Sequence, residues 1–122
     1  MDLLQELWKI NDLLTKALEQ YKQRGREYAQ AYKTYRVMLA QELLRLRAEQ
    51  VPVTIAYDIA RGKEDIANAK EQEIITESLY ESCKEAINTY KLQMKIIQEQ
   101  INTSTRLSAR SSEHMWSRRV HM

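Results

Sequence analysis

The sequence is poor in the residues that make turns. Its 122 residues include two glycines, one proline and no phenylalanine. β-Sandwiches and barrels need many turns, and nucleotide-binding α/β folds need glycine-rich loops, so the composition excludes these classes. The chain also lacks a run of about 18 apolar residues, and we therefore expect no membrane span.

Residues that carry chemistry are scarce as well. Cys83 is the single cysteine, which excludes an internal disulfide framework and fits a reducing compartment. The two histidines, His114 and His121, stand near the C-terminus, away from any Glu-x-x-His pattern that would hold a metal. Asp2 follows the initial methionine and no basic segment precedes an apolar one, so we expect no secretion signal. These features predict a cytoplasmic protein that is not an enzyme and has no cofactor.

What the sequence does contain is typical of long amphipathic helices: 30% charged and 43% apolar residues. The first predicted helix covers residues 2–49. Asp2 and Gln5 resemble a capping box at its start, and Pro52 follows its end. Small or apolar residues recur there at steps of three or four: Leu3, Leu7, Ile10, Leu14, Ala17, Tyr21, Gly25, Tyr28, Tyr32, Tyr35, Leu39, Leu43 and Leu46.

Two further helices are expected, over residues 54–61 and 64–102. For the short one we expect Thr54 as N-cap, an inward face of Ile55, Ala56, Ile59 and Ala60, and Gly62 in the left-handed conformation. The long one has a stripe with the heptad average of 3.5 residues per step: Ile66, Ala69, Glu73, Thr76, Tyr80, Cys83, Ile87, Tyr90, Met94, Ile97 and Ile101. Cys83 on this stripe is interpreted as a structural thiol.

The composition changes after residue 102. Residues 103–122 contain five serines and four arginines, and no helical stripe continues through them. We interpret this segment as a disordered tail or one foreign to the natural domain, and residues 1–102 as the domain.

The two long helices are expected to form a coiled-coil-like antiparallel hairpin of the all-α class, with the short helix at its tip. Residues 22–36 have five basic side chains and one acidic one, and residues 71–85 have the reverse, giving net charges of +4 and −4. With the tip near residue 56, Arg36 is expected beside Glu77 and Arg26 beside Glu85. Apolar residues outside the main stripes predict self-association into a helical bundle, with the candidates Leu44, Ile75, Leu92 and Ile96.

A protein partner is the preferred function class. The candidate interaction surface combines the basic part of the first long helix with the tip: Lys22, Arg24, Arg26, Lys33, Arg36, Tyr57, Arg61 and Lys63. Nucleic-acid binding by the same residues is one alternative, since basic residues alternate with tyrosines there. The tip also has the outline of a helix-turn-helix, although Glu64 and Asp65 would repel phosphates. A structural coiled-coil adaptor is the third alternative.

Three segments resemble small helical proteins of temperate phages and prophages of low-GC Gram-positive bacteria: ELWKINDLLTKALEQY, VPVTIAYDIARGKEDIANAK and EAINTYKLQMKIIQEQI. The resemblance covers residues 4–101 and implies a short early protein of the host cytoplasm, of unassigned function. It carries no defined catalytic or binding motif. It suggests that the chain acts on a host or phage protein, for example by inhibiting a host defence or replication component.

Overall fold

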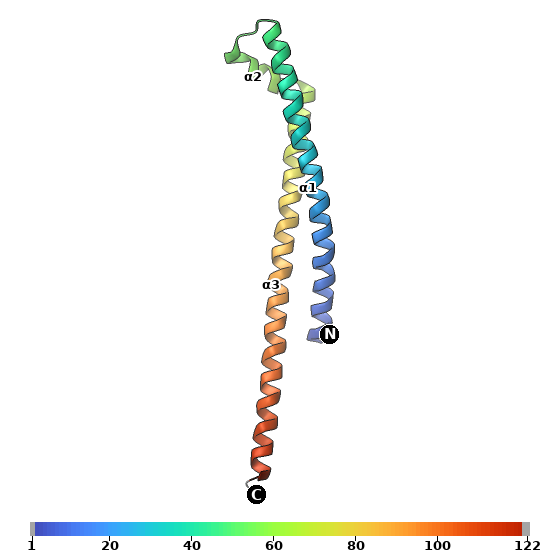
Figure 1. The fold of residues 1–122 in the computed structure, drawn as a ribbon, viewed down its shortest axis with the longest axis vertical. Helices are drawn as coiled ribbons and strands as arrows, with labels where there is room; N and C mark the ends of the chain where they lie inside the picture. Colours follow the sequence, from blue (N-terminus) through green and yellow to red (C-terminus); the bar gives the residue numbers. More distant parts are fainter. Residues whose placement is uncertain (1, 121–122) are drawn as a thin grey trace. The chain divides into compact units, whose positions relative to one another are not determined.

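The computed structural model describes residues 2–120, and their side chains as far as Arg110. Three helices occupy this range: α1 (Leu3–Ala48), α2 (Val53–Gly62) and α3 (Glu64–Val120) (Figure 1). The described residues contain no strand, so the all-α class is confirmed. The chain divides into two compact units, which are described separately: unit 2 spans Leu18–Glu85, and unit 1 combines residues before and after it.

Both ends of α1 follow specific capping motifs. At its start, a carboxylate oxygen of Asp2 accepts a 2.8 Å hydrogen bond from the Gln5 backbone N–H, as the capping box predicts. At its end, the N–H of Gln50 donates to the Arg47 carbonyl and that of Val51 to the Leu46 carbonyl, both at 3.0 Å. These two bonds define a Schellman motif, in which Gln50 has a left-handed φ of 62°.

The caps of α2 differ from those expected. Pro52 stands at its N-cap without a side-chain hydrogen bond, so Thr54 is not the cap. Proline suits this place because its φ is preset and it has no N–H to satisfy. Gly62 does not adopt a positive φ, and Lys63 ends the helix in an extended conformation. The left-handed residue of this region is therefore Gln50.

Unit 2 is an antiparallel hairpin of α1 and α3, with α2 at its turn (Figure 1). Glu42 contacts Lys63 at 3.2 Å, and the ring of Tyr35 lies 4.9 Å from the Lys70 ammonium. The Tyr80 ring comes within 3.0 Å of where a Cβ on Gly25 would stand. In these contacts the residue numbers fall along α1 as they rise along α3, which is the order that antiparallel helices require.

This register differs from the expected one by about one heptad. The Tyr35 ring lies beside Lys70, whereas the expected alignment pairs Tyr35 with a residue about one heptad further along α3. Arg36 is therefore not beside Glu77, and Arg26 is not level with Glu85. The cause is α2, which packs on the last turns of α1, so that α3 begins opposite Glu42. The two charged blocks as wholes still lie at the same level.

The core of unit 2 follows the predicted stripes closely. Its buried members are Tyr35, Leu39, Leu46, Ala56, Ala60, Ile66 and Ala69. Three expected core residues are instead exposed: Tyr32 at 45%, Ile55 at 49% and Ile59 at 47%. Ala31 takes the inward place of Tyr32. In α2 the face that points inward is that of Ala56 and Ala60, so these two alanines are its buried residues.

Unit 1 contains the first turns of α1 and the part of α3 from Ala86 onward. Ala17, Ile87 and Ile97 are buried in it, all on the predicted stripes. The helix α3 does not end at residue 102 but continues to Val120. All side chains from Asn102 to Arg110 are exposed, and whether residues 103–122 are foreign to the domain stays a prediction.

Candidate interaction surfaces

An aromatic cluster fixes the middle of the hairpin in unit 2. The rings of Tyr21 and Tyr80 stack with centroids 4.6 Å apart, and the ring centroids of Tyr28 and Tyr80 are 6.0 Å apart. The hydroxyl of Tyr80 donates a 2.7 Å hydrogen bond to that of Tyr21, which raises the pKa of Tyr80. Gly25 gives the Tyr80 ring the room to lie against α1. The cluster is therefore structural, as the shared stripe predicts.

Buried carboxylates make the polar contacts of the hairpin. Arg45 binds both oxygens of Glu42, and Lys63 adds a bond at 3.2 Å. The hydrogen bonds from Arg45, with help from Lys63, lower the pKa of Glu42 from 4.5 to about 2, against the opposing effect of burial. The contact between Glu42 and Lys63 joins the start of α3 to α1. The periodic pattern does not place Glu42 on the inward face.

Glu73, which interrupts the predicted stripe of α3, is buried with 6% exposure. The Lys70 ammonium lies 3.2 Å from its carboxylate and also faces the Tyr35 ring. The charge pattern predicts that the basic block of the other helix balances the glutamates, but Glu73 takes its partner from its own helix.

The tip of the hairpin exposes large apolar side chains. We call Leu44, Val53, Ile55, Tyr57 and Ile59 the tip surface; Val53 is 73% exposed, Leu44 65%, and the other three about half. Between α1 and α2 lies a cavity of about 420 Å³, lined by Leu44, Val53 and Tyr57 together with Ala40, Leu43, Arg47, Val51 and Ala56. Arg61 lies over the Tyr57 ring, 5.4 Å from its centroid. The tip thus combines an apolar groove with two guanidinium groups.

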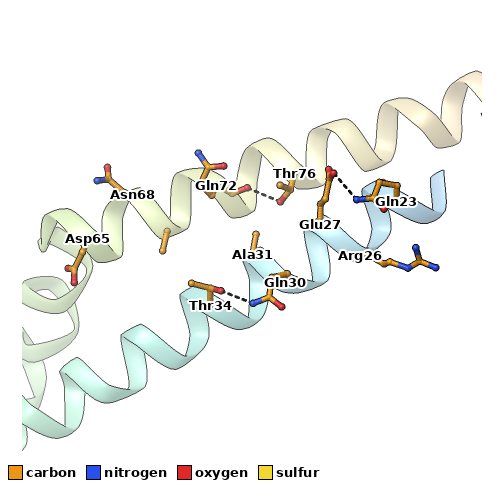
Figure 2. A pocket seen from close by; sticks show the side chains of 11 residues that line it. Gln23, Arg26, Glu27, Gln30, Ala31, Thr34, Asp65, Asn68, Gln72 and Thr76 are labelled. Carbon is orange, nitrogen blue, oxygen red and sulfur yellow. Dashed lines mark hydrogen bonds between the residues drawn. The ribbon is translucent and has the colours of Figure 1, made fainter. Parts of the chain in front are cut away.

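A second, polar groove of about 740 Å³ runs between α1 and α3 (Figure 2). Amide and hydroxyl side chains line it together with Arg26, Glu27 and Asp65, and Ala31 and Ala69 are its apolar members. Figure 2 shows that these groups bond along their own helices: Gln23 donates to Glu27, Gln30 to Thr34, and Thr76 to the Gln72 carbonyl. Because the polar groups do not converge on a point, we assign no ligand to this groove.

The predicted interaction residues fall into separate places in unit 2. Lys22, Lys33 and Arg36 are exposed on α1, and Arg36 lies over the Tyr32 ring. Arg24 instead pairs with Glu27 in its own helix, and Arg26 lines the polar groove. At the tip, Tyr57 and Arg61 form a pair, and Lys63 binds Glu42. The structure therefore divides the candidate surface into a basic face and a tip.

The four candidates for self-association are all exposed, but they do not form one patch. Leu44 and Ile75 belong to unit 2, where the register separates them by roughly 20 Å along the hairpin. Leu92 and Ile96 are one turn apart on α3 in unit 1. Their role in self-association stays a prediction.

The residues with potential catalytic or metal chemistry form no common site in the described part of the chain. Within residues whose side chains are described, no group of three or more His, Cys, Asp or Glu is placed to hold a metal ion. Cys83 is half-buried on the stripe of α3. The side chains of His114 and His121 lie outside the described ones. Over the described helices, none is both long and apolar enough to cross a membrane.

Comparison of the chain with protein-family models, with curated proteins and with solved structures found no match.

Proposed function

We propose that this chain is a non-enzymatic protein–protein interaction module that binds its partner through the tip surface. One observation carries the proposal: Val53 and Tyr57 of α2 are exposed on the groove between α1 and α2, beside the exposed Leu44. Single exposed apolar residues are ordinary, but a contiguous group beside a groove marks a binding surface. The guanidinium groups of Arg47 and Arg61 favour a partner helix with an apolar face and flanking acids.

The resemblance of the sequence to small helical phage proteins adds a biological context to this proposal. On that basis the module is of phage or prophage type, acts in the host cytoplasm and binds a host or phage protein. Inhibition of a host defence or replication component is the concrete version.

The test is site-specific photo-crosslinking in a lysate of a low-GC Gram-positive host. A photoreactive residue at Tyr57 should give one discrete product, which the pair Leu44→Ser and Val53→Ser should abolish. The matched control carries the photoreactive residue at Gln72, in the polar groove. The captured protein is then purified and titrated against the wild type and the double variant. Equal binding by both, or equal capture from Gln72, would contradict the proposal.

Nucleic-acid binding is the second candidate, and the exposed set of Lys22, Lys33, Arg36 and Tyr32 favours it. Basic side chains next to an open aromatic ring can follow a single strand. The acidic block of α3 lies at the same level of unit 2 and would repel phosphate. Titration of single-stranded DNA at several salt concentrations separates the two candidates, because phosphate contacts give a steep loss of affinity with salt. A structural adaptor role would show neither interaction.

A further inference from the structure

Between Leu44 and Lys63, at the tip of the hairpin, the chain has four cationic side chains: Arg45, Arg47, Arg61 and Lys63. Arg45 is paired with two carboxylates, those of Glu42 and Glu49. The Lys63 ammonium lies 3.2 Å from the Glu42 carboxylate. The Arg61 guanidinium lies 5.4 Å from the centroid of the Tyr57 ring. Three of the four cations therefore already have an electrostatic partner within the tip.

Arg47 differs from the other three cations. Among the side chains that the structure describes, none forms a hydrogen bond, an ion pair or a ring contact with its guanidinium group. Arg47 is exposed, and it lines the apolar cavity between α1 and α2 together with Leu44 and Val53. No acidic residue is among those that line this cavity. The groove therefore has a guanidinium group whose donors are open to a ligand.

The α1 wall of the groove places this guanidinium group beside apolar side chains. Leu44 and Leu43 stand three and four positions before Arg47, so the three side chains share one side of α1. A guanidinium group binds a carboxylate through two parallel hydrogen bonds. Apolar side chains around such a pair exclude water and make it stronger than a pair on an open surface. The wall is therefore suited to an apolar group and a carboxylate about one helical turn apart.

We infer that Arg47 is the residue by which the tip surface selects its partner: an amphipathic helix with a glutamate or aspartate three or four positions from an apolar anchor. This inference rests on the proposed function and adds the charge and spacing that the partner helix must have. The occupant is identified by charge, because the groove offers an unpaired cation and no acid. A basic helix would be repelled by Arg47, and an uncharged one would cover it without replacing its bonds to water.

The experiment uses the full chain and capped helical peptides of alanine and glutamine with two leucines four positions apart. Three peptides differ only at one position, a turn beyond the second leucine, which holds glutamate, glutamine or lysine. NMR titration of the isotope-labelled chain gives the dissociation constants and locates the contact at the amides of Leu44, Val53 and Tyr57. We expect the glutamate peptide to bind about tenfold more tightly than the glutamine peptide, and the lysine peptide to bind most weakly.

Variants of the chain test whether this preference comes from Arg47. Arg47→Gln should bind the glutamate and glutamine peptides equally. Arg47→Lys should keep only part of the preference, because an ammonium group does not form the two parallel bonds. The matched control, Arg26→Gln, removes an exposed guanidinium group from the polar groove of the same unit and should keep the full preference. Circular dichroism checks that each variant remains helical.

Three results would overturn the inference. The first is equal binding of the glutamate and glutamine peptides by the wild type. The second is a preference that persists in Arg47→Gln, or that is lost in Arg61→Gln instead. The third is no shift of the tip amides by the glutamate peptide at about millimolar concentration.

The proposed function is tested separately, because photo-crosslinking at Tyr57 does not depend on charge. A captured partner that binds Arg47→Gln as tightly as the wild type would refute this inference and leave the proposed function intact. The absence of a crosslinked product would refute the proposed function itself.

Discussion

Gln50 shows how a single residue shapes the turn. Its φ of 62° lies in the left-handed region, where a side chain other than glycine costs about 1–2 kcal/mol. The Schellman hydrogen bonds and the packing of Val51 on the core hold it there. The C-terminal cap of α1 therefore places a glutamine in a conformation that glycine would adopt without steric cost.

We predict that Gln50→Gly raises the free energy of unfolding by about 1 kcal/mol, because glycine adopts this conformation without steric cost. Urea denaturation measures the change. Gln41→Gly, at an exposed position inside α1, is the matched control and should lower the stability by about 0.5–1 kcal/mol. A loss at both positions would mean that the cap is not strained.

Gly25 is the opposite case, a residue that suits its place. A Cβ there would stand 3.0 Å from the Tyr80 ring, and that ring also contacts the rings of Tyr21 and Tyr28. Alanine is ordinarily better than glycine inside a helix by about 1 kcal/mol. We predict that Gly25→Ala brings no such gain in the wild type, because the ring cannot move aside.

The gain should appear once the ring is gone. In a Tyr80→Ala background, Gly25→Ala should stabilise the chain by about 1 kcal/mol, measured by a double-mutant cycle of urea denaturations. Equal effects of Gly25→Ala in both backgrounds would show that glycine and ring are uncoupled.

Glu42 links stability to pH. Its pKa is about 2 in the folded chain and near 4.5 when unfolded, so the unfolded state binds more protons between these values. Its contribution is complete above about pH 5 and is lost as the pH falls toward 2. We predict that Glu42→Gln flattens the decline of the urea midpoint over this window. Arg45→Gln should flatten it too, because Arg45 is the main cause of the lowered pKa; an unchanged slope in both variants would refute the assignment.

At the scale of the elements, periodicity predicted the faces of the long helices but not their alignment. Nearly every residue of the two stripes is buried or half-buried, since a step of three or four residues fixes the side of a helix. A shift of one heptad leaves that side unchanged, so the pattern could not reveal the position of Lys63 opposite Glu42. The sequence also did not show which face of α2 points inward, because that helix has apolar residues on more than one face. The sequence identified the charged residues of the candidate surface, but their division between the basic face, the polar groove and the tip depends on the register of the two helices.

The C-terminal part of α3 is a helical extension without burial in the range whose side chains are described. From Asn102 to Arg110 every side chain is exposed. We predict that truncation after Asn102 changes the free energy of unfolding by less than about 0.5 kcal/mol, as for surface changes elsewhere. Thermal melting followed by circular dichroism tests this. A loss of more than about 1 kcal/mol would show that the segment packs.

At the scale of the whole molecule, the self-association predicted from the sequence should make stability depend on concentration. Mass action favours a folded oligomer, so the melting temperature should rise by a few degrees per tenfold increase in concentration. Calorimetry at several concentrations measures the rise, and Leu92→Ser with Ile96→Ser should reduce it. A melting temperature independent of concentration in the wild type would contradict self-association.

The contact of Tyr80 with Gly25 affects which register the two helices reach during folding. Two helices with heptad stripes can slide by seven residues and still match apolar to apolar, so an out-of-register hairpin is a natural kinetic trap. In that slipped hairpin Tyr80 would meet Tyr32 instead of Gly25, and two bulky rings would compete for one gap. In the observed register Gly25 leaves room for the ring. The absence of a side chain at Gly25 therefore distinguishes the native register from the slipped one.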